Sequence, residues 1–381
     1  MKLNSFGKNV GTPFGAALSM AAIAALTLSA CGSDNNAGTS GSSGSGSSSA
    51  SAECGGKSSV TAEGSTAQQN AIAEFNKVWG QTCSGKNLSY NPTGSGAGRE
   101  QFIAGNVDFA GSDSALKDDQ IAAAAERCGG NPAWNLPLVF GPIAMAYNVP
   151  GVDKLVLNGD TLAKIFQGQI KKWNDPAIAA LNEGATLPDT GITPIFRSDS
   201  SGTTDNFQKY LEAASAGAWT KGDGSEFQGG AGEGAQKSAG VAQAVQATPG
   251  AIGYVEKGFA DQAGIPYAQI DNGSGAVELT DESAGKAIDA AEFAAEGNDL
   301  TLDLASLYGT QEAGAYPLVL ATYEIVCSKG YDAETAEAVK SFLTVASNEG
   351  QANLSAAGYV PLPDAFKERL VTSIDAISST A

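Results

Sequence analysis

The sequence predicts an α/β fold with largely parallel sheets. From Ser58 onward, short apolar segments alternate with segments whose apolar residues recur at helical spacing, which is the pattern of strands connected by helices. The chain has 381 residues, a length that suggests two domains or one large bilobed body. Hydrophobic residues make up 42% of the chain, so we expect a substantial core rather than a disordered polypeptide.

The charge balance excludes several classes of function. Lys and Arg number 22 against 41 Asp and Glu, the net charge is −19, and histidine is absent. Nucleic acids and anionic membrane surfaces are bound mainly by clustered Lys and Arg, so neither is an expected partner. The absence of histidine excludes Ser-His-Asp and Cys-His catalysis and histidine-based zinc sites.

Residues 1–30 have the anatomy of a secretory signal peptide. Lys2 and Lys8 precede a run of small apolar residues over 15–30, and Cys31 follows. The order Leu-Ser-Ala-Cys at 28–31 resembles the bacterial lipobox, whose cysteine becomes a diacylated N-terminus. This predicts export and lipidation of Cys31. The alternatives are an ordinary signal peptide with an incidental cysteine and a membrane span, although a span needs about 20 apolar residues.

The segment 31–53 is predicted to be a flexible tether. After the cysteine it consists mainly of Gly and Ser, and it contains too little apolar surface to fold. A random coil of this length reaches roughly 25 Å. That reach suits a folded body held away from a membrane.

The remaining cysteines are Cys54, Cys83, Cys128 and Cys327, and none of them forms a C-x-x-C pair. An even number of cysteines in an exported protein favours disulfides. Four cysteines allow three pairings, and the sequence alone does not choose among them. Our hypothesis is Cys54–Cys83 and Cys128–Cys327, because each pair flanks segments that we expect to be neighbours in one domain.

The expected strands and helices follow one another along the folded part. Strands are predicted over 136–148 with one interruption, and over 192–196, 251–255 and 317–326. Helices are predicted through 72–79, around 102–103, over 161–166 and 176–181, through 207–211 and over 333–345.

Two proline-bearing breaks predict the points at which the chain crosses between lobes. They are Gly141-Pro142 and Tyr316-Pro317. With crossings there, residues 54–140 and 317–381 form lobe I, and residues 141–316 form lobe II. The alternative is that these prolines mark ordinary loops.

Three turns share one design, in which small residues and a hydroxyl precede a helix. They lie at residues 64–67, 94–98 and 200–204. The free N–H groups and the positive dipole end of a helix start can bind an anion. The alternative is that each Ser or Thr caps its own helix. None of the turns is a Walker A loop or a convincing Rossmann motif, so an adenine nucleotide is not expected.

Three charged residues accompany these turns. Arg197 ends an apolar strand just before the third turn, and Asp199 is placed to hold its guanidinium in a fixed fork. A surface ion pair is the alternative. Asp113 follows another predicted strand in a Ser- and Gly-rich loop, where turn formation or capping is the alternative role.

These residues together carry a resemblance to a known family. The matching segments are 64–66, 94–96, 107–113, 197–204, 250–255, 165–168, 170–176 and 361–363, which read GST, GSG, VDFAGSD, RSDSSGTT, GAIGYV, IFQG, IKKWNDP and PLP. In order along residues 58–370, the chain resembles the substrate-binding lipoprotein of the bacterial high-affinity phosphate ABC transporter. The resemblance implies a type II periplasmic-binding-protein fold, in which two lobes close on one phosphate across two interdomain crossings.

The resemblance also implies a set of phosphate-binding residues. Carried over by position, they are Thr66, Ala67, Ser95, Asp113, Arg197, Ser201, Gly202 and Thr203. Asp199 would orient the arginine. Two positions depart from the common family pattern, because Ser200 stands where glycine is frequent and Ala67 where an aromatic residue is often found. A backbone N–H survives either change, so the departures affect loop geometry more than binding.

The implied function is binding of inorganic phosphate outside the cytoplasm and its delivery to an ABC permease. The resemblance implies a monomer that is anchored by lipid to the outer face of the cell membrane, with no enzymatic activity, cofactor or metal. Phosphate near neutral pH keeps at least one proton, so its P–OH group can donate a hydrogen bond to the Asp113 carboxylate. Sulfate keeps no proton, so Asp113 would favour phosphate over sulfate. Three alternatives remain open: a receptor for sulfate or molybdate, a surface lipoprotein or adhesin with a vestigial pocket, and a phosphoester hydrolase with Thr66 or Ser201 as nucleophile.

Overall fold

The computed structural model describes residues 53–294 and 296–380. The predicted signal peptide, the lipidation site at Cys31 and all but the last residue of the predicted tether lie outside the described residues. Within these residues, no helix has the length and apolar character required to cross a bilayer.

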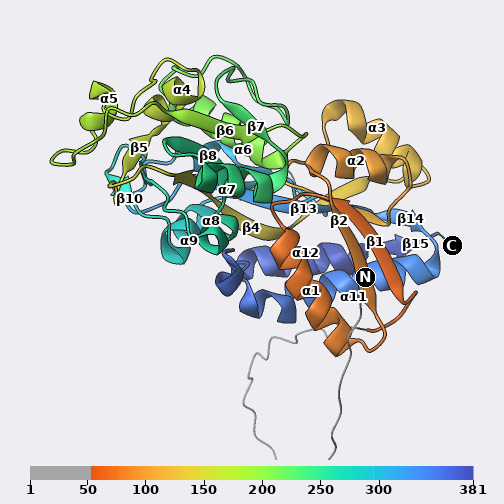
Figure 1. Ribbon diagram of the computed structural model, residues 1–381. Helices are drawn as coiled ribbons and strands as arrows, with labels where there is room; N and C mark the ends of the chain where they lie inside the picture. Colours follow the sequence, from red (N-terminus) through yellow and green to blue (C-terminus); the bar gives the residue numbers. More distant parts are fainter. Residues whose placement is uncertain (1–52, 295, 381) are drawn as a thin grey trace, which may run out of the picture. The chain divides into compact units, whose positions relative to one another are not determined.

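A curled sheet of eight strands organises the fold (Figure 1). In order across the sheet, the strands are β2 (Asn87–Pro92), β1 (Ser59–Gly64), β3 (Phe109–Ser112), β13 (Val319–Cys327), β4 (Ala133–Tyr147), β8 (Ala251–Glu256), β6 (Thr193–Arg197) and β7 (Glu233–Ala235). A three-stranded sheet contains β10 (Ala276–Val277), β9 (Gln269–Asp271) and β5 (Val156–Asn158). Two pairs of short strands are β11 (Glu292–Phe293) with β12 (Leu302–Asp303), and β14 (Lys329–Tyr331) with β15 (Ser378–Ser379).

Helices connect most of these strands, as the alternating sequence pattern predicts. They are α1 (Gln69–Thr82), α2 (Ser95–Ile103), α3 (Asp118–Arg127), α4 (Gly159–Phe166), α5 (Pro176–Ala179), α6 (Gly202–Ala214), α7 (Lys237–Ala247), α8 (Lys257–Ala263), α9 (Asp281–Asp289), α10 (Ala305–Tyr308), α11 (Ala333–Ser347) and α12 (Asp364–Ala376). Two 3₁₀ turns, Glu349–Asn353 and Ser355–Ala357, precede α12. The α/β prediction is therefore confirmed.

The prediction of largely parallel sheets is correct at the two edges of the large sheet and wrong at its centre. Strand β1 is parallel to β2 and β3, and β6 is parallel to β7 and β8. Strand β13 is antiparallel to β3 and β4, and β4 is antiparallel to β8. The two long central strands run in opposite directions, because the chain traverses the sheet along β4 and returns along β13.

The predicted interruption of the strand over 136–148 is wrong, because β4 is one continuous strand. It changes its partner at the predicted break instead. Pro142 is paired with Val319 of β13, and the next residue, Ile143, is paired with Glu256 of β8. Proline cannot donate a ladder hydrogen bond, and it lies where one ladder gives way to the other.

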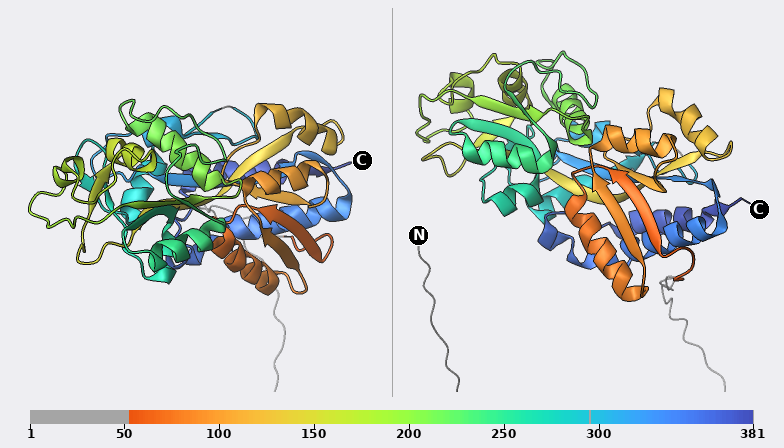
Figure 2. Two further views of the ribbon diagram at one scale, coloured as in Figure 1. Left: turned by 45° about the horizontal axis from the view of Figure 1, so that its top comes forward. Right: turned by 45° about the vertical axis from the view of Figure 1, so that its right-hand side comes forward.

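The helical spacing recognised near the N-terminus reflects burial against α11 and β3. Ile72, Phe75 and Trp79 of α1 are all buried. Trp79 meets the Phe342 ring of α11 edge-on with the centroids 5.4 Å apart, and Phe109 of β3 stacks on the same ring at 5.7 Å. Figure 2 shows α1 and α11 on one side of β1 and β3, with α2 and α3 on the other.

A second aromatic cluster holds α6 against the sheet. The Phe207 ring stacks on Tyr254 of β8 with the centroids 4.4 Å apart, and it meets Phe166 of α4 at 4.8 Å. This packing places the start of α6, and with it the third hydroxyl-bearing turn, close to the ends of β6 and β8.

The cysteine pairing that we hypothesised is confirmed by two disulfides. Cys54 is bonded to Cys83, which directly follows α1, and Cys128, which directly follows α3, is bonded to Cys327 at the end of β13. The two bridges span 29 and 199 residues of sequence.

We predict that the longer bridge contributes more to stability. Replacing both cysteines of a pair with serine should lower the free energy of unfolding by about 2–5 kcal/mol. Because chain entropy lost on closing a loop grows with its length, the loss for C128S/C327S should exceed that for C54S/C83S by about 1–2 kcal/mol. Urea unfolding of both double variants tests this, and an equal or reversed order would contradict it.

Candidate anion-binding site

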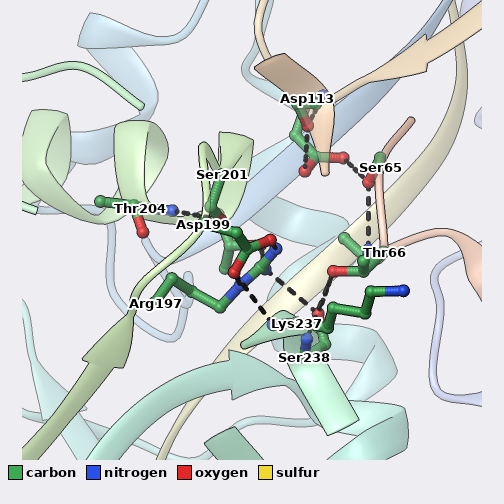
Figure 3. Close-up of polar contacts among 12 residues, drawn as sticks. Ser65, Thr66, Asp113, Arg197, Asp199, Ser201, Thr204, Lys237 and Ser238 are labelled. Atoms are coloured by element: carbon green, nitrogen blue, oxygen red, sulfur yellow. Dashed lines mark hydrogen bonds and ion pairs between the residues drawn. The ribbon is translucent and has the colours of Figure 1, made fainter. Parts of the chain in front are cut away.

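The carboxylate of Asp113 lies buried directly after β3, at the centre of a cluster of hydroxyl groups (Figure 3). Its Oδ1 accepts hydrogen bonds from Ser65 Oγ at 2.5 Å and from Thr322 Oγ1 at 2.7 Å. Its Oδ2 accepts one from Ser95 Oγ at 3.0 Å. The alternative role in turn formation or helix capping does not describe Asp113, because its side chain connects three segments that are distant in the sequence, those of Ser65, Ser95 and Thr322.

Burial raises the pKa of Asp113 to about 6, against its usual value near 4. The hydrogen bonds from Ser65, Thr322 and Ser95 favour the charged form and oppose this effect, whereas nearby Glu256 adds to it. Asp113 is therefore ionised at neutral pH but gains a proton under mildly acidic conditions.

The first turn does not use its hydroxyls to cap α1. The residue preceding that helix makes no capping hydrogen bond with its side chain. Ser65 Oγ instead accepts a hydrogen bond from the buried Ala67 N–H at 3.0 Å while donating to Asp113. Thr66 Oγ1 lies 2.8 Å from Ser238 Oγ. The capping alternative is thus wrong for this turn.

The second turn likewise directs its hydroxyl toward the carboxylate. Gly94 precedes α2 with a φ of 110°, a conformation that favours glycine, and there is no side-chain cap. Ser95 begins the helix and contacts Asp113, and Gly96 N–H donates to the Ser200 carbonyl at 3.2 Å. A Cβ on Gly96 would lie 2.0 Å from Ser200 Oγ, so the small residue permits the second and third turns to meet.

The third turn does contain a helix cap. Ser201 Oγ accepts a hydrogen bond from Thr204 N–H at 3.2 Å, so the capping alternative is correct for Ser201. Gly202 follows and lies directly against the acidic group, because a Cβ there would be 2.5 Å from Asp113 Cβ and 2.6 Å from Ser95 Oγ. The positive end of α6 therefore faces this carboxylate.

Arg197 and Asp199 form the predicted fork. Arg197 Nε donates to Asp199 Oδ1 at 2.8 Å, and Nη2 donates to Oδ2 at 2.5 Å. The arginine side chain is only 2% exposed, so the alternative of a surface ion pair is wrong. Burial alone would raise the pKa of Asp199, but hydrogen bonds from Arg197 and from Lys237 N–H outweigh it and hold the pKa below its usual range.

Thr203 contacts a second buried carboxylate. Its Oγ1 donates to Glu256 Oε1 at 2.6 Å and accepts a weaker hydrogen bond from Arg197 Nη1 at 3.5 Å. Glu256 is fully buried, and within the described part of the chain its Oε2 has no hydrogen-bond partner.

The structure thus brings all the predicted site residues into one network of contacts. These are Thr66, Ala67, Ser95, Asp113, Arg197, Asp199, Ser201, Gly202 and Thr203.

Four members of this network are absent from the predicted site: Ser65, which lies in the first predicted turn, and Ser238, Thr322 and Glu256. Ser238 near the start of α7 contacts Thr66 and accepts from Arg197 Nη1 at 3.4 Å. It follows a Gly-rich segment, so it was recognisable as a fourth hydroxyl near a helix start. Thr322 lies inside an apolar strand, and Glu256 closes the apolar run AIGYV. Nothing in the sequence around Thr322 marks it.

Comparison with known proteins assigns the chain to a family. A family model described as a PBP superfamily domain matches residues 36–349. Phosphate-binding protein PstS3 of Mycobacterium bovis BCG is 50% identical over 380 residues, covering 99% of this chain and all of the relative. The chain belongs to the PstS phosphate-binding protein family. PstS 2 of Mycobacterium tuberculosis is also 50% identical, in an alignment that covers 96% of this chain and 98% of the PstS 2 chain. PstS of Pasteurella multocida is 32% identical over 82% of this chain and 88% of its own.

Solved structures support the fold of this PstS family member. A periplasmic phosphate-binding protein bound with phosphate, PfluDING, aligns with a TM-score of 0.66 at 24% identity, covering 82% of this chain and 93% of that one. A phosphate ABC transporter substrate-binding protein from Clostridium perfringens aligns with a TM-score of 0.57 at 18% identity. The alignment covers 80% of this chain and 100% of the Clostridium perfringens chain. The implied type II periplasmic-binding-protein fold is thereby confirmed.

The contact between Gly202 and Asp113 generates a prediction about stability. Gly202→Ala should lower the free energy of unfolding by about 1–3 kcal/mol, because its Cβ overlaps the carboxylate and α6 must shift. Gly285→Ala is the matched control. It lies in α9 with no other atom within 4 Å of its Cβ position, and it should be neutral or stabilising by up to about 1 kcal/mol. Equal effects in urea unfolding would contradict the close approach.

Proposed function

We propose that this chain binds inorganic phosphate outside the cytoplasm and delivers it to the permease of an ABC transporter for high-affinity uptake. The observation that carries the proposal is a buried carboxylate among hydroxyl donors and helix starts, in a chain half identical to proteins named for phosphate binding. The role requires binding and release without chemical turnover.

The proposed phosphate ligands are the residues that the sequence predicted. The Thr66 and Ser201 hydroxyls, the Arg197 guanidinium and the backbone N–H groups of Gly202 and Thr203 would supply donors. The Ser95 hydroxyl, the Thr203 hydroxyl and the Ala67 N–H donate to Asp113, Glu256 and Ser65 in this structure, so each would have to turn toward the anion when it binds. The first N–H groups of a helix have no partner within the helix, so α6 presents free donors next to Asp113. Asp199 would keep the guanidinium in one orientation through its paired hydrogen bonds.

Asp113 is the proposed source of selectivity. An ionised carboxylate accepts the hydrogen bond that a protonated phosphate oxygen offers. Sulfate has no proton near neutral pH, so two anionic oxygens would face each other away from water, which costs several kcal/mol. Receptors for sulfate or molybdate should therefore lack such an acceptor at this position.

The charged side chains around the site leave little net positive charge, so we propose that hydroxyl and N–H dipoles, rather than cationic side chains, mainly hold the anion. The charge of Arg197 is largely balanced by Asp199, and Asp113 adds a negative charge. Neutral hydroxyl and N–H dipoles aimed inward can hold an anion in a water-poor site without a surplus of lysines. The overall charge of −19 acts over longer distances, where salt screens it beyond about 10 Å.

We also propose that the site lies between two lobes, residues 54–140 with 317–381 and residues 141–316. The change of partner along β4 at residues 142 and 143 supports this division. Asp113 belongs to the first set, and Arg197 and Gly202 belong to the second. Opening of the lobes would separate the two groups of ligands and release phosphate to the permease.

The Leu-Ser-Ala-Cys order at 28–31 supports lipid anchoring at the outer face of the cell membrane through Cys31, and we also propose that the molecule acts as a monomer. The network supports binding rather than hydrolysis, because within the described residues neither of the two hydroxyls considered as nucleophiles is hydrogen-bonded to a group that could act as a general base. Thr66 Oγ1 is paired with Ser238 Oγ, and Ser201 Oγ accepts from Thr204 N–H. No metal or cofactor is proposed, and no activity on a chromogenic phosphoester is expected.

The first prediction of this proposal concerns anion selectivity. Asp113→Asn should narrow the preference for phosphate over sulfate by about 10- to 100-fold, because hydrogen bonds to a charged group contribute about 1.5–3 kcal/mol. Calorimetric titration of phosphate-stripped protein with each anion measures this. Asp205→Asn is the control, since this buried carboxylate pairs with Lys209 and Ser114 instead. Unchanged selectivity in Asp113→Asn would refute the assigned role.

The second prediction concerns pH. As the pH falls through about 6, Asp113 gains a proton and becomes a donor. Sulfate stays unprotonated across this range, so its affinity for the wild type should rise at lower pH and report on the protein alone. The gain should be absent in Asp113→Asn. Sulfate titrations between about pH 5 and 8 test this, and a flat wild-type profile, or the same slope in both proteins, would contradict it.

A further inference from the structure

Arg99 on α2 is a buried arginine that the proposed ligand set does not use. Only 2% of the Arg99 surface is exposed to solvent. Nε donates to Gln120 Oε1 at 3.0 Å, Nη1 to Ser112 Oγ at 2.7 Å, and Nη2 to Ser225 Oγ at 3.2 Å. All three acceptors are neutral. Among the described residues, no carboxylate forms an ion pair with this guanidinium.

A buried cation without a counter-ion is expensive, and arginine does not escape that cost by losing its proton. Burial does lower the pKa of Arg99, while the charges of Asp205 and Asp113 oppose the change. The guanidinium therefore remains positive in a region whose other arginine, Arg197, is already paired with Asp199. Asp205 and Asp113 attract this charge without forming an ion pair with it, so an anion bound next to Asp113 would be a further partner for it.

The contacts of Arg99 reach both sides of the site. Ser112 immediately precedes Asp113, and Gln120 lies on α3 in the same N-terminal part of the chain. Ser225 belongs instead to the segment between residues 141 and 316. Its carbonyl accepts a hydrogen bond from Ser201 N–H at 2.9 Å, one residue before α6 begins. The arginine thus connects the backbone next to Asp113 with the loop that supports the start of α6.

We propose that Arg99 is a further positioning residue for phosphate binding, which latches the Ser225 loop across the site and supplies positive charge that the Arg197–Asp199 pair does not. The inference rests on the proposed function and deepens it. Because the hydrogen bond between Arg99 and Ser225 joins the two proposed lobes, it forms only when they approach each other. It therefore stabilises the arrangement that encloses the anion.

Ser225→Ala tests the latch with little disturbance of the fold. It removes the acceptor on the far side and leaves the contacts of Arg99 with Ser112 and Gln120. We expect its affinity for inorganic phosphate, measured by calorimetry on the phosphate-stripped full chain, to fall about tenfold or more. Its thermal unfolding midpoint without phosphate should match that of the wild type, since the contact matters chiefly in the enclosed form.

Gln120→Ala is the matched control. It removes another neutral acceptor of the same guanidinium, but one in the same lobe as Arg99, so its phosphate affinity should stay within about twofold of the wild type. Arg99→Met should weaken binding at least as much as Ser225→Ala, and Arg99→Lys should restore part of the loss, because lysine retains the charge but is a single point donor.

The outcomes separate the two levels of the proposal. A wild type that does not bind phosphate overturns the proposed function and this inference with it. A wild type that binds, with Ser225→Ala and Gln120→Ala equally affected or equally unaffected, overturns the inference alone. A drop in the phosphate-free unfolding midpoint of Ser225→Ala as large as in the phosphate-bound protein would likewise assign Arg99 a purely structural role.

Discussion

The burial of the Asp113 carboxylate is the constraint on which the arrangement of the site depends. An ionised carboxylate away from water is costly unless its oxygens are hydrogen-bonded. The donors are Ser65, Ser95 and Thr322, which come from the turn after β1, from α2 and from the returning strand β13. Satisfying this one group therefore determines how three distant segments meet, and the glycine at the start of α6 completes the enclosure.

Much of this arrangement was predictable because its components are local. Small residues and hydroxyls before a helix are visible in a few consecutive positions, and so is an arginine followed two residues later by an aspartate. The pairing of Cys54 with Cys83 and of Cys128 with Cys327 followed from expected neighbourhood within a domain, and the structure confirms it. The alternation of strands and helices likewise predicted the α/β class.

The role of Thr322 and the antiparallel centre of the sheet were not predictable, because both depend on tertiary pairing. Thr322 reaches Asp113 only because β13 lies beside β3, and its apolar surroundings in the sequence give no hint of a polar role. The antiparallel centre of the sheet is a property of how β4 and β13 pass each other. The role of each hydroxyl also needed the structure, since Ser201 caps its helix whereas Ser65 and Ser95 bind a carboxylate.

The bridge between Cys128 and Cys327 has a consequence for the integrity of the molecule. The two cysteines are 199 residues apart in the sequence, and the loops around Trp219 and Ser225 lie between them. A protease that cuts the backbone once inside this span produces two fragments that remain covalently joined, at the ends of α3 and β13. A chain cut in this way therefore stays one molecule in an oxidising environment. The N-terminal fragment, which contains β3 and Asp113, remains bonded to the C-terminal fragment, which contains the end of β13.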